Sequence, residues 1–170
     1  ATKPLIFIFG GSQGSVALNS VIADSQANLL EQGVQILHGI GARNEAPADQ
    51  EGYQARGYIT DMATAYLAAD LIISRSGAVT CAEVNTLGRY ALFIPLPIGN
   101  GEQELNAAEL ISQSRAELLP QREFTATWLT SHIKRLLSQS ATAPMSGSDV
   151  DINAASKMVS LIEHALHGGK

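Results

Sequence analysis

Residues 6–21 read IFIFGGSQGSVALNSV, and this stretch decides the fold of the chain. Leu5–Phe9 is short, continuous and apolar, as expected of a strand that is buried on both faces of a parallel sheet. Glycines end this run, and apolar residues near helical spacing then follow over Val16–Leu30, up to Gly33. A buried strand, a tight glycine turn and a helix in immediate succession predict the first unit of an α/β fold.

The same alternation continues to the end of the chain. We expect further strands at residues 34–37, 57–59, 71–74, 90–95 and 117–119, and further helices at 61–68, 77–87, 102–113, 124–137 and 152–166. Residues 39–54, 96–101 and 141–148 read as loops or connectors. The pattern predicts a Rossmann-like, doubly wound, mostly parallel six-stranded sheet, whose ligands bind beyond the carboxyl ends of its strands.

Composition limits the possible classes of protein. The 170 residues suit one domain or one half of a two-domain protein, and 45% hydrophobic residues argue against disorder. A net charge of −5 argues against a general nucleic-acid interface. The single cysteine fits a reducing cytoplasm, and no apolar run approaches the roughly 18–20 residues that cross a bilayer. Because the chain starts with alanine close to a strand, we expect a piece of a longer protein.

The first glycine turn has the features of a phosphate site. Glycines let a ligand touch the backbone, and the helix behind them offers free N–H groups and partial positive charge. The expected contacts are Gly11, Ser12, Gln13 and Gly14, with Ser12 adding a hydroxyl donor. The spacing is neither that of the dinucleotide fingerprint nor that of the Walker loop. A tight turn without any ligand would have a similar sequence.

The same residues also match G-x-S-x-G, the nucleophile elbow of serine hydrolases. Ser12, Asp61 and His132 occur in the order that such enzymes require. Such a hydrolase takes an oxyanion donor from the loop of an earlier strand, and too few residues precede Ser12 to form that strand. A serine hydrolase remains one alternative, and a non-catalytic, nucleotide-binding Rossmann-like module is the other.

A second loop, SRSGAVTCAE, follows the strand at 71–74 and opens another helix. Thr80 and Glu83 have the spacing of a capping box, which alone would explain both residues. In a functional interpretation, Glu83 faces the cleft and accepts hydrogen bonds from a vicinal diol such as a ribose. The backbone contacts expected from this loop are those of Gly77, Ala78, Val79 and Thr80.

A third loop, PLPIGNGEQELNA, follows the strand at 90–95. Gln103 and Asn106 lie within one helical turn, and their amides both donate and accept, which suits the hydroxyls of a sugar. Helix capping and a solvated helix face are the alternative interpretation.

Together, GGSQG, RSGAVTCAE and PLPIGNGEQELNA resemble the MurG family of peptidoglycan N-acetylglucosaminyltransferases. The run YITDMATAYLAADLIISRSGA strengthens this resemblance, which covers roughly residues 5–166. It implies one half of a GT-B glycosyltransferase, namely the carboxyl-terminal half that binds UDP-N-acetylglucosamine.

The resemblance also implies roles for single residues. Ser12 would lie near the diphosphate, Ile59 would offer its backbone to the uracil edge, and residues 78–80 would present N–H groups to the phosphates. Glu83 would hold the ribose hydroxyls. In the third loop, Gln103 and Asn106 would contact the hydroxyls of N-acetylglucosamine.

The family resemblance places the rest of the enzyme outside this chain. The amino-terminal half would bind the lipid-linked acceptor and carry the general base, so no catalytic residue, cofactor or metal is expected here. The parent enzyme would be peripheral at the cytoplasmic face of the bacterial membrane, and this chain alone would be inactive. Two departures are Glu102, where many relatives have His or Gln, and Arg115-Ala116 in place of Gly-Ala, which we expect to be a surface change.

Other residues with functional potential have simpler interpretations. Asp149 and Asp151 form a D-x-D at the start of the last predicted helix, where acids cap helices more often than they bind metal. His38 is expected to be solvated or hydrogen-bonded, and Cys81 to be a small packed residue.

Overall fold

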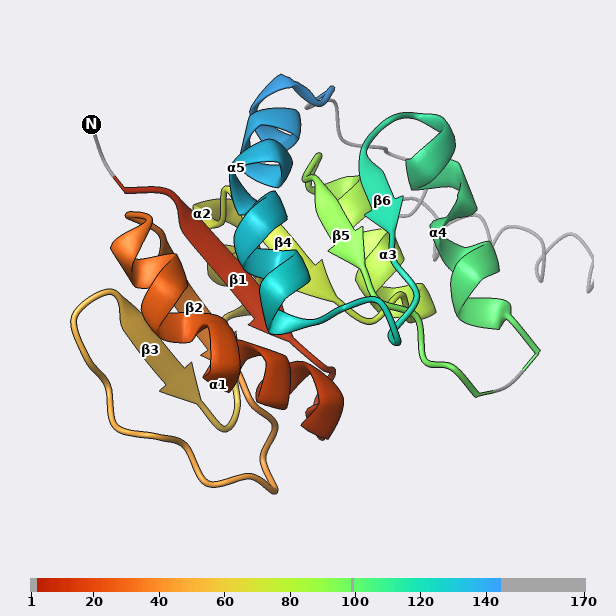
Figure 1. The fold of residues 1–170 in the computed structure, drawn as a ribbon. Helices are drawn as coiled ribbons and strands as arrows, with labels where there is room; N and C mark the ends of the chain where they lie inside the picture. The colour runs from red at the N-terminus through yellow and green to blue at the C-terminus, as the bar shows by residue number, and fades with distance from the viewer. Residues whose placement is uncertain (1–2, 99, 145–170) are drawn as a thin grey trace, which may run out of the picture.

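The computed structural model describes residues 3–98 and 100–144 and shows one six-stranded, fully parallel sheet (Figure 1). Its elements, in chain order, are β1 (Leu5–Phe9), α1 (Val16–Glu31), β2 (Gln35–Gly39), β3 (Tyr53–Arg56), α2 (Met62–Ala68), β4 (Leu71–Ser74), α3 (Ala78–Thr86), β5 (Ala91–Phe93), α4 (Glu102–Ser112), β6 (Ala116–Leu118) and α5 (Ala126–Thr142). The predicted Rossmann-like fold is therefore confirmed.

The strand order is β3-β2-β1-β4-β5-β6. β1 pairs with β2 on one side and with β4 on the other, where Phe9 lies opposite Ser74. The chain therefore winds outward in both directions from the junction of β1 and β4. In a doubly wound sheet, this junction leaves a crevice at the carboxyl ends of the two strands.

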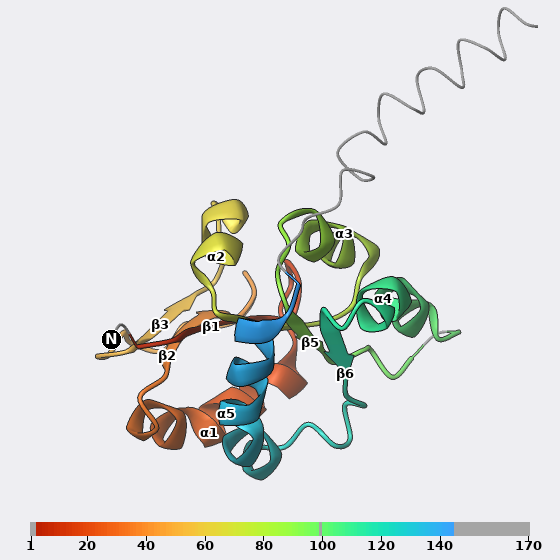
Figure 2. The same cartoon turned by 90° about the horizontal axis from the view of Figure 1, so that it is seen from above.

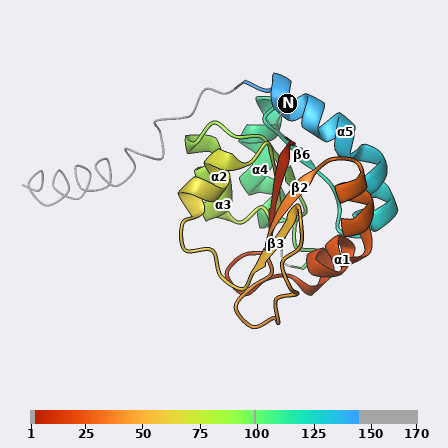
Figure 3. The same cartoon turned by 90° about the vertical axis from the view of Figure 1, so that its left-hand side faces the viewer.

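Helices cover both faces of the sheet. α1 and α5 lie together on one face, and α2, α3 and α4 lie on the other (Figures 2 and 3). Alternate residues of β1 enter the two cores, with Ile6 and Ile8 under α1 and α5, and Phe7 and Phe9 under the other helices. Because both faces of β1 are buried, its sequence is apolar without interruption.

The third strand was predicted in the wrong place. β3 is Tyr53–Arg56 and begins inside the segment 39–54 that was interpreted as a loop, whereas residues 57–59 are not a strand. Tyr53 and Ala55 are buried and Gln54 is exposed, so the strand alternates over only four residues at the edge of the sheet. Such a short alternation among polar neighbours gives a weak signal.

Arg115 is buried at 2% exposure, so the expectation of a surface change was wrong. Its Nη1 donates to Asn85 Oδ1 (2.6 Å), and its Nη2 donates to the carbonyl oxygens of Val84 (3.1 Å) and Asn85 (2.9 Å). These carbonyls belong to the last turn of α3, where backbone acceptors lack partners within the helix. Arg115 therefore closes the carboxyl end of α3.

The carboxyl-terminal expectations are only partly covered by the described residues. α5 continues to Thr142, beyond the predicted end at residue 137, and takes in the start of the expected connector. The expected helix at 152–166 and the D-x-D of Asp149 and Asp151 lie outside the described residues. Within residues 3–98 and 100–144, no helix combines the length and the apolar character that a membrane span requires.

Candidate functional site

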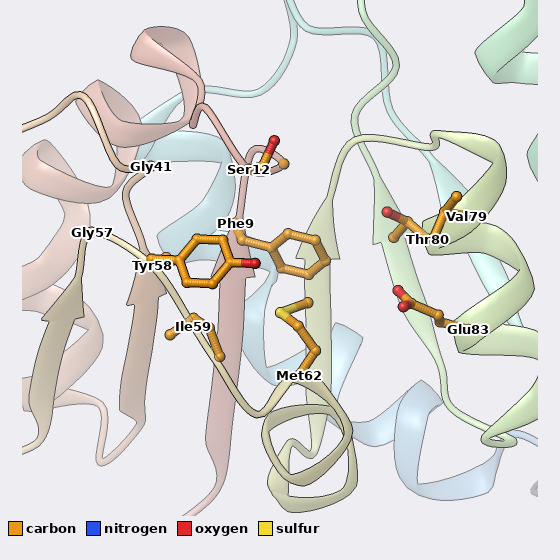
Figure 4. Close-up of a pocket in the computed structure, with 12 residues that line it drawn as sticks. Phe9, Ser12, Gly41, Gly57, Tyr58, Ile59, Met62, Val79, Thr80 and Glu83 are labelled. Atoms are coloured by element: carbon orange, nitrogen blue, oxygen red, sulfur yellow. The ribbon is translucent and has the colours of Figure 1, made fainter.

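A cavity of about 310 Å³ opens at the carboxyl ends of β1 and β4 (Figure 4). Its walls come from four places: the end of β1 with the turn after it, the end of β2 with the loop after it, the segment from β3 into α2, and the start of α3. The cavity thus occupies the crevice that the strand order creates.

Six of the residues predicted from the sequence line this cavity. They are Gly11, Ser12, Ile59, Val79, Thr80 and Glu83. Figure 4 shows Ile59 on one wall, Thr80 and Glu83 on the opposite wall, and Ser12 at one end. Segments that are far apart in the sequence are therefore brought together as expected.

Six further lining residues were missed: Phe9, Gly39, Gly41, Gly57, Tyr58 and Met62. Gly39 ends β2, Gly41 follows it and Gly57 follows β3, in segments whose strand boundaries were misplaced. Tyr58 and Met62 flank Ile59 in YITDM, a motif already noted, so the sequence held a usable signal for them. With Ile59 they give this wall an apolar surface.

The turn after β1 is held tightly by its surroundings. Gly14 has φ +79°, and a Cβ added there would overlap the carbonyl oxygen of Ile40. Asn44 Nδ2 donates to that same oxygen (2.8 Å), and the Gly14 N–H donates to the Gly11 carbonyl (3.0 Å). Helix α1 is capped by Ser15, whose Oγ accepts from the Leu18 N–H (3.4 Å).

The turn after β4 is open by contrast. Gly77 is the N-cap of α3 and has no side-chain hydrogen bond to offer, so the capping-box interpretation of Thr80 and Glu83 was wrong. A Cβ added at Gly77 would meet no atom within 4 Å. The N–H groups of the first turn of α3 have no side-chain cap, and with the helix dipole they favour an anion.

Glu83 is half-buried, and its carboxylate points into the cavity (Figure 4). Its Oε2 accepts a hydrogen bond from the Tyr66 hydroxyl (2.8 Å). A carboxylate has about four acceptor sites, so it retains the capacity to accept from a ligand.

Arg75 lies between the two turns without lining the cavity. Its Nη2 donates to Ser15 Oγ (2.9 Å) and to Gln121 Oε1 (2.5 Å), and its Nη1 donates to the carbonyls of Ile94 (3.0 Å) and Pro95 (3.1 Å). These contacts tie the start of α1 to the exit of β5. Among the described residues that line the cavity, none is cationic.

Gln103 and Asn106 do not line this cavity. Gln103 Oε1 accepts from the Leu96 N–H (2.9 Å), and Asn106 Nδ2 donates to the Ser76 carbonyl (3.1 Å). Gln103 Nε2 and Asn106 Oδ1 have no hydrogen-bond partner among the described residues. Their contact with a sugar remains a prediction.

The structure does not assemble the hydrolase triad. His132 lies on α5, where its ring stacks on Trp128 with centroids 4.3 Å apart. Asp61 is the N-cap of α2 and accepts from the Thr64 N–H (3.0 Å). Neither residue lines the cavity that holds Ser12.

His38 and Cys81 are packed inside the protein. His38 Nδ1 lies 3.0 Å from the Tyr53 hydroxyl, and its Nε2 lies 3.0 Å from Asn19 Oδ1. Burial lowers the pKa of His38 to about 4 and raises the pKa of the Cys81 thiol to about 11. Among the residues that the structure describes, no cluster of His, Cys, Asp and Glu has the makings of a metal site.

The sequence is similar to a defined domain family and to named enzymes. Residues 5–164 match the family described as Glycosyltransferase family 28 C-terminal domain. The chain is 44% identical, over 142 residues, to the UDP-N-acetylglucosamine–N-acetylmuramyl-(pentapeptide) pyrophosphoryl-undecaprenol N-acetylglucosamine transferase of Corynebacterium efficiens, covering 84% of this chain and 39% of that enzyme. The enzyme of the same name from Thermobifida fusca is 35% identical over 171 residues, covering 93% of this chain and 45% of that protein.

Solved structures of glycosyltransferases also align with this chain. The crystal structure of Acinetobacter baumannii MurG aligns with a TM-score of 0.74 and 32% identity, covering 92% of this chain and 50% of that one. A calicheamicin glycosyltransferase aligns with a TM-score of 0.64 at 15% identity, covering 82% of this chain and 35% of that one, which shows a shared fold alone. The chain spans about two fifths of the length of the curated relatives it matches.

Proposed function

The chain belongs to glycosyltransferase family 28, whose C-terminal domain it matches, and from that premise we propose that it is the donor-binding half of a UDP-N-acetylglucosamine-dependent transferase. One observation carries the proposal: the same cavity holds the uncapped amino end of α3 and the carboxylate of Glu83. The first suits a diphosphate and the second suits a ribose diol.

The arrangement of the walls supports a uridine nucleotide in one orientation. Tyr58, Ile59 and Met62 offer an apolar surface for a base on one side of the cavity. Glu83 stands on the opposite wall, and the start of α3 lies beside it. A nucleotide would place its base against the first wall, its ribose at Glu83 and its phosphates at the amides of Ala78, Val79 and Thr80.

The reaction we propose for the whole enzyme is transfer of N-acetylglucosamine to a lipid-linked MurNAc-pentapeptide with inversion. The acceptor hydroxyl forms a bond to the anomeric carbon while the bond to the diphosphate oxygen breaks, and UDP leaves. Negative charge grows on the diphosphate, so the helix N-termini would stabilise the leaving group. The acceptor, the base that takes the hydroxyl proton and the peripheral position at the cytoplasmic face of the membrane belong to the proposal for the whole enzyme.

Calorimetric titration of the chain with UDP and UDP-N-acetylglucosamine tests this function. Both should bind, and Glu83→Ala should weaken binding at least about tenfold, because a hydrogen bond to a charged group contributes about 1.5–3 kcal/mol. Glu117→Ala is the matched control, since Glu117 also accepts from a tyrosine but lies outside the cavity. Absence of nucleotide binding, or equal affinities for wild type and Glu83→Ala, contradicts the proposal.

A labelling experiment separates the hydrolase alternative. A fluorophosphonate probe should leave Ser12 unmodified, because the described residues that line the cavity include no histidine to activate its hydroxyl. Modification of Ser12 at a rate above that of a Ser12→Ala background would favour the hydrolase. We further expect this chain alone to show no turnover with a lipid-linked acceptor.

A further inference from the structure

Tyr66 lies behind Glu83 and does not itself line the cavity. It belongs to α2 and is only 1% exposed. Its ring meets Phe7 and Phe9 edge to face, with centroids 5.7 and 5.8 Å apart. Its hydroxyl is the polar end of this aromatic group, and it donates to Glu83 Oε2. The ring contacts fix the place of the hydroxyl, and the hydroxyl contacts the carboxylate.

The hydrogen bond runs in one direction. Burial, followed by the hydrogen bond to Glu83, raises the pKa of Tyr66 far above its ordinary value, so the phenol stays protonated and donates. Glu83 therefore accepts, as a carboxylate does, and Oε1 has no protein partner among the described residues. The bond also reduces the number of rotamers that this long side chain can adopt before a ligand arrives.

We propose that Tyr66 is a positioning residue that orients the Glu83 carboxylate toward the two hydroxyls of a ribose, and so sets a preference for ribonucleotides over 2′-deoxyribonucleotides. This inference rests on the proposed function, because it concerns the ligand of the same cavity. A carboxylate held by one oxygen presents the other in a fixed direction. The two hydroxyls of a ribose can both donate a hydrogen bond to a carboxylate in this orientation, whereas a 2′-deoxyribose can donate only one.

A packing role alone makes a different prediction. Tyr66→Phe keeps the ring contacts with Phe7 and Phe9 and removes only the hydroxyl. If Tyr66 merely fills the core, this variant changes stability but treats the two sugars as wild type does. If it positions Glu83, the variant loses affinity for the ribonucleotide selectively.

The chain supplies a matched control. Tyr90 is also buried, and its hydroxyl donates to Glu117 Oε1 (2.7 Å), in a pair that lies outside the cavity. Tyr90→Phe therefore removes the same kind of bond elsewhere. It should affect folding stability comparably and leave nucleotide selectivity unchanged.

The experiment is calorimetric titration of wild type, Tyr66→Phe and Tyr90→Phe with UDP and with 2′-deoxy-UDP. We expect Tyr66→Phe to weaken UDP binding about five- to tenfold and 2′-deoxy-UDP binding less than about twofold, since the lost bond involves a charged acceptor. The dissociation constant for 2′-deoxy-UDP divided by that for UDP should therefore fall in Tyr66→Phe. The same ratio should keep its wild-type value in Tyr90→Phe. An unchanged ratio in Tyr66→Phe overturns the inference while leaving the proposed function intact.

A crystal structure of the wild-type chain with UDP gives a readout that needs no variant. The Tyr66 hydroxyl should remain within hydrogen-bond distance of Glu83 while the carboxylate contacts O2′ and O3′. Loss of the Tyr66 contact on binding, with the ribose still at Glu83, overturns the inference. Failure of the wild type to bind UDP at all removes both the inference and the proposed function.

Discussion

The turn after β1 and the turn after β4 both contain glycine and both lead from a strand into a helix beside the cavity, but their glycines serve different needs. At Gly14 the backbone has φ +79° and the carbonyl of Ile40 occupies the space of a side chain. At Gly77 the backbone has φ −65°, and the space around it is open. The first turn needs glycine for its own fold, whereas the second leaves room beside bare amides.

The comparison extends to the caps of the two helices. Ser15 closes the start of α1 and is itself held by Arg75, whereas Gly77 leaves the start of α3 without a side-chain cap. A rigid turn beside an uncapped helix start is a suitable arrangement for binding an anion.

The largest effect is expected for Gly14→Ala. Alanine disfavours positive φ, and its methyl group would collide with a backbone carbonyl, so we expect a loss of about 3 kcal/mol or more in the free energy of unfolding. Gly77→Ala is the control and should cost less than about 1 kcal/mol. Urea denaturation measures both, and equal losses would remove the distinction between the turns.

Arg115→Met should open the other end of α3. It removes the donor of Asn85 Oδ1 and the arginine hydrogen bonds to the carbonyls of Val84 and Asn85, which keep only the backbone N–H donors of Arg89 and Gly88. We expect this loss to lower the free energy of unfolding by about 2–3 kcal/mol. Arg135→Met removes an arginine from a partly exposed ion pair and should cost less than about 1 kcal/mol. The two variants are compared by urea denaturation, and similar costs would show that Arg115 is not a structural cap.

Mild acid should weaken the support of the first turn. Asn19 links His38 to the Ile40 carbonyl that packs against Gly14. The pKa of His38 is about 4 in the fold and about 6.5 when unfolded, so the unfolded chain binds the proton first as pH falls. Stability from neutral His38 is complete above pH 6.5 and declines toward pH 4, with a loss of about 2 kcal/mol at pH 5.

Denaturation curves between pH 7 and pH 5 measure this decline. His38→Gln, whose amide can also donate on one side and accept on the other, should flatten it. A decline of equal steepness in the variant would assign the effect to other groups.

The smallest effects are expected from substitutions at the N-caps of α1 and α3. Ser15→Ala removes the cap of α1 and should cost about 1 kcal/mol. Gly77→Ser adds a hydroxyl at the open cap of α3 and should stabilise the fold by a few tenths of a kcal/mol. Because that hydroxyl would occupy an amide needed by the ligand, Gly77→Ser should weaken UDP binding. A rise in both stability and affinity would contradict the role given to the open turn.

Local chemistry explains which parts of the fold the sequence predicted. The strand at 71–74 was predicted to the residue, since a strand buried on both faces must be apolar throughout. β3 was misplaced because its pairing with β2, rather than its own four residues, holds it in the sheet. Arg115 lies between α4 and β6 and was misjudged because its acceptors lie on α3, about thirty positions earlier in the sequence.

The site follows the same rule. Ser12, Thr80 and Glu83 were found because each stands next to a glycine turn with recognisable chemistry. Gly41 was missed because its role depends on the chain of Gln13 and Gly14 passing close by. Tyr66 was part of a quoted motif, but its bond to Glu83 appears only when α2 and α3 are packed together.

The central position of β1 has a consequence for how the protein is made. β1 has β2 and β4 as its neighbours, and β4 begins only at Leu71. During synthesis on the ribosome, one edge of β1 therefore stays without its partner strand until the nascent chain has extended past β4. Truncations that end before Leu71 should remain poorly structured and prone to aggregation, because an unpaired apolar strand edge attracts other chains.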